Sequence, residues 1–133
     1  MKGSLTIVGL GPGAPELITP AVTDALKDST DIVGYSKYIE RVKDASGKSF
    51  HPSDNREEID RAELSINLAL QGKKVVVVSS GDPGVFAMAS AIFEVVDKKN
   101  ISIDDLPIVV LPGITALLAA SARLGAPIGH DFC

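Results

Sequence analysis

Four consecutive valines at residues 75–78 interrupt the alternation of apolar and polar positions that marks a strand with one solvent-facing side. An unbroken apolar run of this kind predicts a strand buried on both faces, as in the middle of a parallel sheet. The turn Gly81-Asp82-Pro83-Gly84 follows the run, and residues 85–93 then begin an apolar helix. Open α/β folds bind ligands at such carboxyl ends of strands, although a plain strand-to-helix connection explains this turn equally well.

Strand and helix signals alternate along the rest of the chain. Further apolar segments predict strands at residues 4–8, 31–35, 48–51 and 108–111. Thr19 before Pro20 predicts a helix start, and the capping-box spacing of residues 54–57 opens a second helix, which Gly72 ends. Three more helices are predicted at residues 36–42, 85–98 and 116–124. The alternation predicts an α/β fold with an open, mainly parallel five-stranded sheet and helices on both faces.

Composition excludes several classes of protein. With 133 residues, 45% of them hydrophobic, the chain is large enough for one domain with a substantial core. A formal charge of −4 without a basic block argues against nucleic-acid binding. The sequence has no apolar run near the length of about 20 residues that a membrane span needs, and no signal peptide, which predicts a soluble, cytoplasmic protein. One cysteine, Cys133, and two histidines, His51 and His130, exclude an internal disulfide and make a poor zinc site, so no metal is expected.

Glycine or proline follows three of the predicted strands, at residues 9–13, 81–84 and 112–113. Because parallel strands end at the same edge of a sheet, these loops are expected to converge on one crevice. Each glycine taken singly is explained by backbone geometry. Three such loops with few ionisable residues together suggest a ligand held largely by main-chain groups.

The first of these loops, residues 9–14, also satisfies the dinucleotide-binding pattern Gly-x-Gly-x-x-Ala. That interpretation is rejected because the helix starts only after Thr19, whereas a dinucleotide site needs a helix that starts within the glycines. The nearest acid, Asp31, precedes the second strand instead of following it. The sequence also lacks a Walker-type phosphate loop and a Gly-x-Ser-x-Gly nucleophile elbow.

Three segments together, residues 9–19, 80–83 and 111–116, resemble the S-adenosylmethionine-dependent tetrapyrrole methylase family in order and spacing. Within it, residues 34–39, 55–58, 79–88 and 124–133 resemble the branch that methylates C17 of precorrin-3B or cobalt-factor III, with ring contraction, in cobalamin biosynthesis. The resemblance implies the strand order 3-2-4-1-5 and a homodimer. It also implies two α/β domains with the cofactor between them, so residues 1–133 are expected to be the N-terminal domain, with the second domain absent.

The resemblance further implies which residues line the site. Those expected to bind S-adenosylmethionine are Pro12, Ser80, Gly81, Asp82, Val85, Thr115 and Ala116. Those assigned to the tetrapyrrole substrate are Gly11, Gly13, Tyr35, Ser36 and Lys37. Lys37 or Arg41 would receive the carboxylates of the ring, or would only face solvent. Related uroporphyrinogen methylases carry an acid where this chain has Ser36, so a carboxylate base is not available there, and no catalytic residue is assigned.

Alternatives to this function remain open. One is another methylase of the same fold, acting on uroporphyrinogen III, another precorrin, a diphthamide precursor or ribosomal RNA. Another is a non-catalytic α/β module that binds a nucleotide or a protein partner. Asp82 is expected either near the cationic end of the cofactor or as a cap of its own turn.

Two expectations follow from the implied second domain. Direct methyl transfer depends mainly on positioning, and a ligand held between two domains loses about half of its contacts when one is missing. The 133-residue chain is therefore expected to bind S-adenosylmethionine weakly and to transfer no methyl group. The apolar surface left around Pro12, Val85 and Ile114 is expected to favour association into a dimer.

Overall fold

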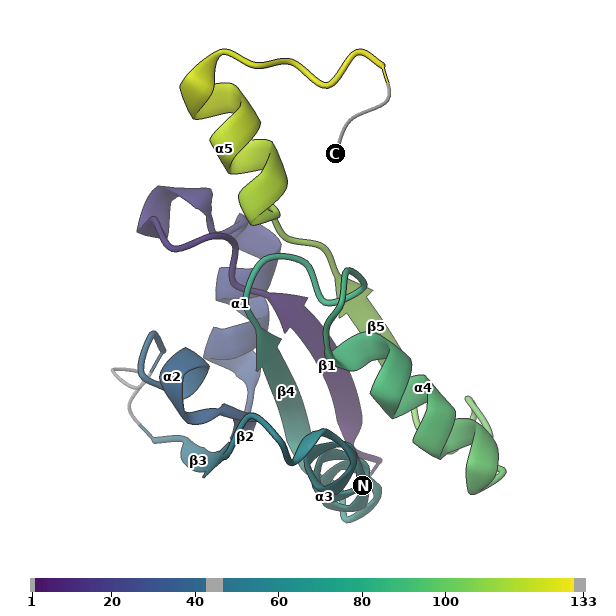
Figure 1. The fold of residues 1–133 in the computed structure, drawn as a ribbon. Helices are drawn as coiled ribbons and strands as arrows, with labels where there is room; N and C mark the ends of the chain where they lie inside the picture. The colour runs from purple at the N-terminus through teal and green to yellow at the C-terminus, as the bar shows by residue number, and fades with distance from the viewer. Residues whose placement is uncertain (1, 43–46, 131–133) are drawn as a thin grey trace.

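The computed structural model describes residues 2–42 and 47–130, and their strands form one parallel sheet (Figure 1). The strands are β1 (Ser4–Gly9), β2 (Asp31–Tyr35), β3 (Ser49–Ser53), β4 (Lys74–Ser79) and β5 (Ile108–Leu111). They pair in the order β3-β2-β4-β1-β5, and every ladder between them is parallel. The predicted strand order is confirmed, and β4, which contains the four valines, lies in the centre of the sheet.

Helices cover both faces of this sheet. The helices are α1 (Pro20–Asp28), α2 (Ser36–Ile39), α3 (Glu58–Leu70), α4 (Met88–Lys98) and α5 (Ala116–Leu124), with a short 3-10 helix, η1, at Pro15–Leu17. Of these, α5 stands apart from the two covered faces (Figure 1). Val75 and Val77 pack with α3 and α4, whereas Val76 and Val78 pack on the other face with α1 and α2. Successive side chains of β4 therefore enter two separate cores, which is why this strand needs an unbroken apolar run.

Two of the predicted helix starts can be followed in detail. The hydroxyl of Thr19 accepts the N–H of Val22 at 3.3 Å, which confirms the cap of α1. Only half of the predicted capping box forms: the Glu57 carboxylate accepts the N–H of Asp54 at 3.0 Å. The Asp54 carboxylate accepts the N–H of Arg56 instead. Residues 54–57 thus form a turn of their own, and α3 begins after it, at Glu58.

The start of α4 differs from the prediction by three residues, because the helix begins at Met88 and not at residue 85. Phe86 has a left-handed backbone, with a φ of 51°, and Ala87 is extended. The N–H of Val85 donates to the carbonyl of Asp82 at 3.2 Å, which closes a turn at the sheet edge. The apolar residues before α4 therefore belong to the loop, and the Phe86 side chain is fully exposed.

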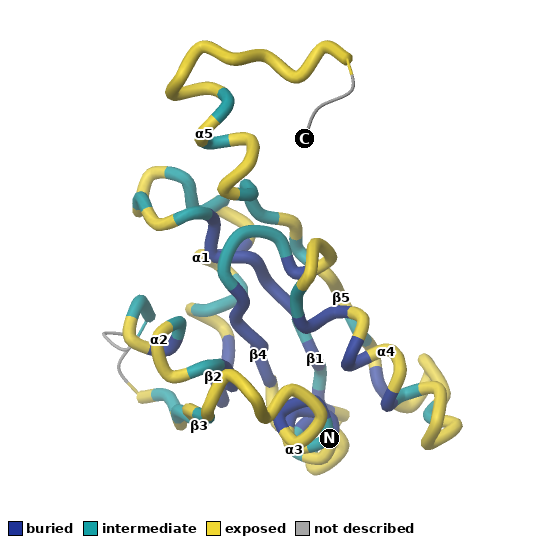
Figure 2. The backbone as a smooth tube through the Cα atoms, in the orientation of Figure 1, coloured by how far each residue is buried: buried dark blue, intermediate teal, exposed yellow. Residues whose placement is uncertain are grey.

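Burial is concentrated in the centre of the sheet and is lost toward the C-terminal helix (Figure 2). Most residues of β1 and β4 are buried, whereas α5 has no buried residue. The predicted segment 124–133 follows α5; His130 is exposed, and residues 131–133, including Cys133, lie outside the described residues.

None of the helices within the described residues is both long and apolar enough to cross a membrane.

Candidate functional site

The loops after β4, β1 and β5 lie against one another through their backbones. Gly11 and Gly81 exchange two hydrogen bonds, with N···O distances of 3.1 and 2.9 Å. A Cβ atom at Gly9 or at Gly113 would lie 2.1 Å from the carbonyl oxygen of Gly81. The predicted convergence of the three loops is therefore present. Gly9 and Gly113 are required by the contact between the loops themselves.

Asp82 joins two of these loops. One carboxylate oxygen accepts the N–H of Gly84 at 2.9 Å, and the other accepts the N–H of Gly113, also at 2.9 Å. Both oxygens are thus used by backbone groups. Of the two roles expected for Asp82, this geometry supports the cap, extended to the neighbouring loop after β5.

Arg41 stabilises the loop after β1 through hydrogen bonds to its backbone. Its guanidinium donates to the carbonyl oxygens of Leu10 at 2.7 Å and Gly11 at 3.2 Å. Partial burial lowers the pKa of Arg41 from its ordinary value. In this arrangement the Arg41 donors are directed at the loop, whereas one role expected for them was to receive the carboxylates of a substrate.

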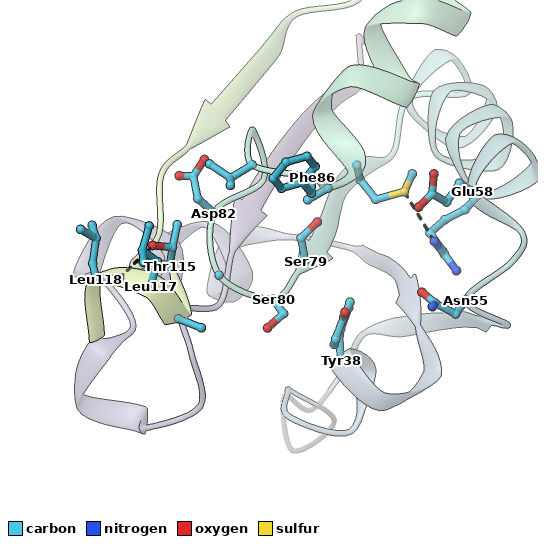
Figure 3. Close-up of a pocket in the computed structure, with 16 residues that line it drawn as sticks. Tyr38, Asn55, Glu58, Ser79, Ser80, Asp82, Phe86, Thr115, Leu117 and Leu118 are labelled. Atoms are coloured by element: carbon cyan, nitrogen blue, oxygen red, sulfur yellow. Dashed lines mark hydrogen bonds between the residues drawn. The ribbon is translucent and has the colours of Figure 1, made fainter. Parts of the chain in front are cut away.

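A pocket of about 640 Å³ opens where the loops after β4 and β5 face α3 (Figure 3). Its wall is formed by Tyr38, Asn55, Glu58, Arg61, Ser79, Ser80, Gly81, Asp82, Val85, Phe86, Ala87, Met88, Thr115, Ala116, Leu117 and Leu118. Most of these are apolar or small, and the few polar groups converge from separate elements. This is the usual character of a small-molecule site.

The predicted cofactor residues are nearly all in this wall. Ser80, Gly81, Asp82, Val85, Thr115 and Ala116 line the pocket. Pro12 is not among the lining residues, although the preceding Gly11 is bonded to Gly81. Thr115 also caps α5, because its hydroxyl accepts the N–H of Leu118 at 3.3 Å. The first N–H groups of that helix have no acceptor within the helix.

The residues assigned to the substrate lie outside the pocket wall. Ser36 donates its hydroxyl to the carbonyl of Ser53 at 3.0 Å. The ring of Tyr35 meets that of Tyr38 edge to face, with centroids 5.1 Å apart, and only Tyr38 lines the pocket. Lys37 is exposed to solvent. Gly11 and Gly13 belong to the loop after β1, where Gly11 is buried in the bridge and Gly13 is exposed.

Arg61, on α3, lines the pocket and was not predicted as a site residue. It is only 4% exposed. Its Nε donates to the hydroxyl of Ser53 at 2.8 Å, one Nη donates to the carbonyl of Asp54, and the other contacts the Met88 sulfur at 3.5 Å. Burial lowers the pKa of Arg61, an effect opposed by the nearby carboxylate of Glu58. Its side chain thereby ties α3 to the end of β3 and the start of α4.

Ser79, at the end of β4, is the second pocket residue that the sequence did not single out for ligand binding. Its side chain is buried, and its hydroxyl has no hydrogen-bond partner among the described residues. The only signals in the sequence were its position after the valines and its place in the distinctive segment 79–88.

His51 lies on β3, as predicted. It contacts Asp31 at the end of the sheet where the strands begin, opposite the end that carries the pocket. Its Nε2 lies 2.9 Å from a carboxylate oxygen of Asp31, and the hydroxyl of Thr30 donates to the other oxygen at 2.7 Å. Burial alone would raise the pKa of Asp31, but the bonds from Thr30 and His51 outweigh it, and the pKa lies below its ordinary value. This pair belongs to the amino end of β2, away from the pocket.

Comparison with known proteins gives concordant matches. The family model for Tetrapyrrole (Corrin/Porphyrin) Methylases matches residues 4–133. A precorrin-3B C(17)-methyltransferase from Sinorhizobium sp. is 45% identical over 133 residues, which are 100% of this chain and 52% of that protein. The crystal structure of the methyltransferase CobJ superposes with a TM-score of 0.93 at 55% identity, covering 99% of this chain and 55% of that one.

A third protein is a uroporphyrin-III C-methyl transferase from Thermus thermophilus, solved in complex with S-adenyl homocysteine. It has a TM-score of 0.74 and 27% identity, and covers 96% of this chain and 54% of that one. The chain thus spans about half the length of these relatives. The match of the family model along residues 4–133, together with the parallel sheet and its three interlocked loops, shows that the chain belongs to the tetrapyrrole methylase family.

Proposed function

We propose that this chain forms the cofactor-binding half of an S-adenosylmethionine-dependent methyltransferase that acts on C17 of precorrin-3B or cobalt-factor III, with ring contraction, in cobalamin biosynthesis. The observation that carries the proposal is the pocket at the carboxyl edge of β4 and β5, whose wall contains six of the seven residues expected to contact the cofactor. The 45% identity to a precorrin-3B C(17)-methyltransferase supports the choice of substrate.

The pocket fits the proposed cofactor in size and chemistry. Its volume of about 640 Å³ lies in the range of roughly 300–1,000 Å³ typical of small-molecule sites. Apolar side chains such as Val85 and Leu117 suit a nucleoside, and the start of α5 offers N–H donors. When bound, S-adenosylmethionine supplies an electrophilic methyl group on its sulfonium. The residues of this chain then hold the cofactor and exclude water from it.

The rest of the predicted site remains a proposal. Gly11, Gly13, Tyr35, Ser36 and Lys37 would contact the tetrapyrrole from beyond the pocket wall. No residue of this chain is proposed as an acid or a base. A direct displacement from a sulfonium needs alignment of the two reactants, which can supply roughly 7–11 kcal/mol of the barrier.

The exposed apolar side chains beside the pocket suggest what covers it. Val85 and Leu118 are about half exposed, and Phe86 is fully exposed. We propose that a second α/β domain packs over this side of the pocket and that the protein forms a homodimer in the cytoplasm. Light scattering of the protein expressed from its whole gene, here called the encoded protein, should show twice the mass of one chain. A single-chain mass at high concentration would contradict the dimer.

The activity is tested by incubating the encoded protein with S-adenosylmethionine and, in separate reactions, with precorrin-3B, cobalt-factor III and uroporphyrinogen III. Mass spectrometry should show one added methyl group on one of the first two rings. Residues 1–133 alone should bind the cofactor weakly and give no methylated product. Methylation of uroporphyrinogen III would favour the alternative of another methylase with the same fold. Cofactor binding without any methylation would favour a non-catalytic module.

A further inference from the structure

The guanidinium of Arg61 is a buried charge at the edge of the pocket. Among the described residues, no carboxylate lies within ion-pair distance of it, and its acceptors are a hydroxyl, a carbonyl and a thioether. The thioether of Met88 is a weak acceptor. Burying a guanidinium without an opposite charge is costly, and an arginine has five N–H donors in a planar fork that matches a carboxylate. The carboxylates of Glu58, Glu57 and Asp54 act on this charge from beyond ion-pair distance. The guanidinium therefore has no direct anionic partner, and an anionic ligand suits it.

Ser79 provides an independent sign of a missing partner. Its hydroxyl is buried and lacks a hydrogen bond among the described residues, which is rare for a buried polar atom. Because Val75 and Val77 face α3 and α4, the alternation along β4 directs Ser79 to that same side. This is the side on which Arg61 meets Met88. In Figure 3 the Ser79 side chain lies below Phe86, with Asp82 to its left and Glu58 to its right, and all four residues line the pocket.

We propose that Arg61 and Ser79 form a subsite that binds a carboxylate inside the pocket. The identity of the ligand rests on the proposed function. Asp82 and Glu58 are the acidic residues of the pocket wall. Both oxygens of Asp82 are held by backbone N–H groups, and Glu58 is exposed to solvent at the rim. Among the described residues, no carboxylate accepts a hydrogen bond from Arg61, and the proposed source of the missing carboxylate is a ligand.

Two ligands of the proposed reaction carry such a group. S-adenosylmethionine has the carboxylate of its methionine end, and the tetrapyrrole has acetate and propionate side chains. The two sources are separated by the assay in which a change appears. A change in the binding of S-adenosylhomocysteine assigns the subsite to the cofactor, whereas a change confined to the KM of the ring assigns it to the substrate.

Acetate tests the subsite directly, in an experiment that requires neither S-adenosylhomocysteine nor the tetrapyrrole. In the encoded protein, the Arg61 Nε–H resonance, identified by its loss in Arg61→Lys, should shift saturably with acetate at constant ionic strength, with chloride as the control. Ser79→Ala should need several times more acetate for the same shift. The absence of a saturable shift in the wild type would overturn the subsite.

Ser79→Ala and Ser65→Ala make a matched pair. Ser65 is buried on α3, but its hydroxyl donates to the Ala62 carbonyl at 2.8 Å and does not line the pocket. Removing the unpartnered Ser79 hydroxyl should leave the unliganded protein as stable or more stable, whereas Ser65→Ala should destabilise it. Ser79→Ala should weaken one of the two ligands about tenfold, and Ser65→Ala should weaken neither.

Arg61→Lys keeps the charge without the planar fork and should weaken the same ligand as Ser79→Ala. If Arg61 variants do not fold, the serine pair alone decides. Unchanged binding of both S-adenosylhomocysteine and the ring in Ser79→Ala would refute the subsite. If the wild type binds acetate at Arg61 but neither of those ligands, the proposed function fails and the subsite stands.

Discussion

Replacing Gly113 by alanine should separate the loops that build the pocket, and the cost can be worked from the structure. The added Cβ would lie 2.1 Å from the Gly81 carbonyl oxygen and 2.9 Å from that of Gly9. Both neighbours are backbone atoms, and Cβ atoms essentially never approach closer than 3.0 Å. The loops after β4 and β5 must therefore part by about 1 Å, since no side chain can rotate out of the way.

The expected loss of stability has two sources. Overpacking of a well-packed region costs about 1–3 kcal/mol. Parting the loops also strains three hydrogen bonds, the two of the Gly11–Gly81 bridge and the one from Gly113 to Asp82, and the loss of two of them would cost about 2 kcal/mol. Together these predict that Gly113→Ala lowers the free energy of unfolding by about 3–5 kcal/mol. Binding of S-adenosylhomocysteine should weaken too, because Thr115 and Ala116 follow Gly113 into the pocket wall.

Urea unfolding of the encoded protein, followed by circular dichroism, measures this loss. For a slope near 2 kcal/mol per molar urea, the midpoint should fall by about 2 M. Gly129→Ala is the matched control, because a Cβ there meets nothing within 4 Å, and it should change stability by less than about 0.5 kcal/mol. If Gly113→Ala unfolds within about 1 kcal/mol of the wild type at an unchanged slope, the close approach of the loops is not a constraint and the reasoning fails.

Three further predictions concern single side chains. Asp82→Ala should destabilise the protein by about 2–3 kcal/mol and Asp82→Asn by less, measured by urea unfolding; a stable Asp82→Ala that no longer binds S-adenosylhomocysteine would instead support a direct contact with the cofactor. The pKa of Asp31 is lowered from its ordinary value of 3.8, so its stabilising contribution is complete above that pH and is lost as the pH falls below it. When the pH is lowered from 6 to 3, the urea midpoint should therefore decrease less in Asp31→Asn than in the wild type, and parallel curves would contradict this. Phe86→Gly should leave stability unchanged or raise it by up to about 1 kcal/mol in thermal unfolding, because the side chain is exposed and its φ is 51°; a loss of several kcal/mol would show that the ring is buried in the protein as encoded.

The fold could be predicted well because its signals are local and repeated. The valines at 75–78 have no polar face, so only a central strand accommodates them, and Thr19 before Pro20 leaves little choice for the start of α1. The Phe86 region could not be placed in this way. Its apolar residues match a helix, but the turn closed by Asp82 keeps them at the sheet edge. That turn depends on Gly113, which is 31 positions away from Asp82.

The site was only partly predictable for a related reason. The loops after β4 and β5 carry glycine and proline, and these residues mark them in the sequence. Arg61 carries no such mark, because an arginine on an amphipathic helix is ordinarily solvent-facing. It is buried here because Ser53 and Met88, which are 8 and 27 positions away, bring acceptors to it. Long-range contacts of this kind are set by packing and not by any local pattern.

The wall of the pocket is formed by both well-buried and exposed elements of the chain, the strand β4 and the helix α5. Ser79 and Ser80 extend from the central strand, whereas Thr115 to Leu118 begin a helix of nine residues that has no buried side chain. An isolated helix of this length is marginal in water, so α5 should open locally far more often than β4 does. Amide hydrogen exchange should therefore be fast in α5 and slow in β4. A ligand that fills the pocket should slow hydrogen exchange in α5 before it slows exchange elsewhere. The pocket wall formed by α5 would then become well ordered only when a ligand is bound.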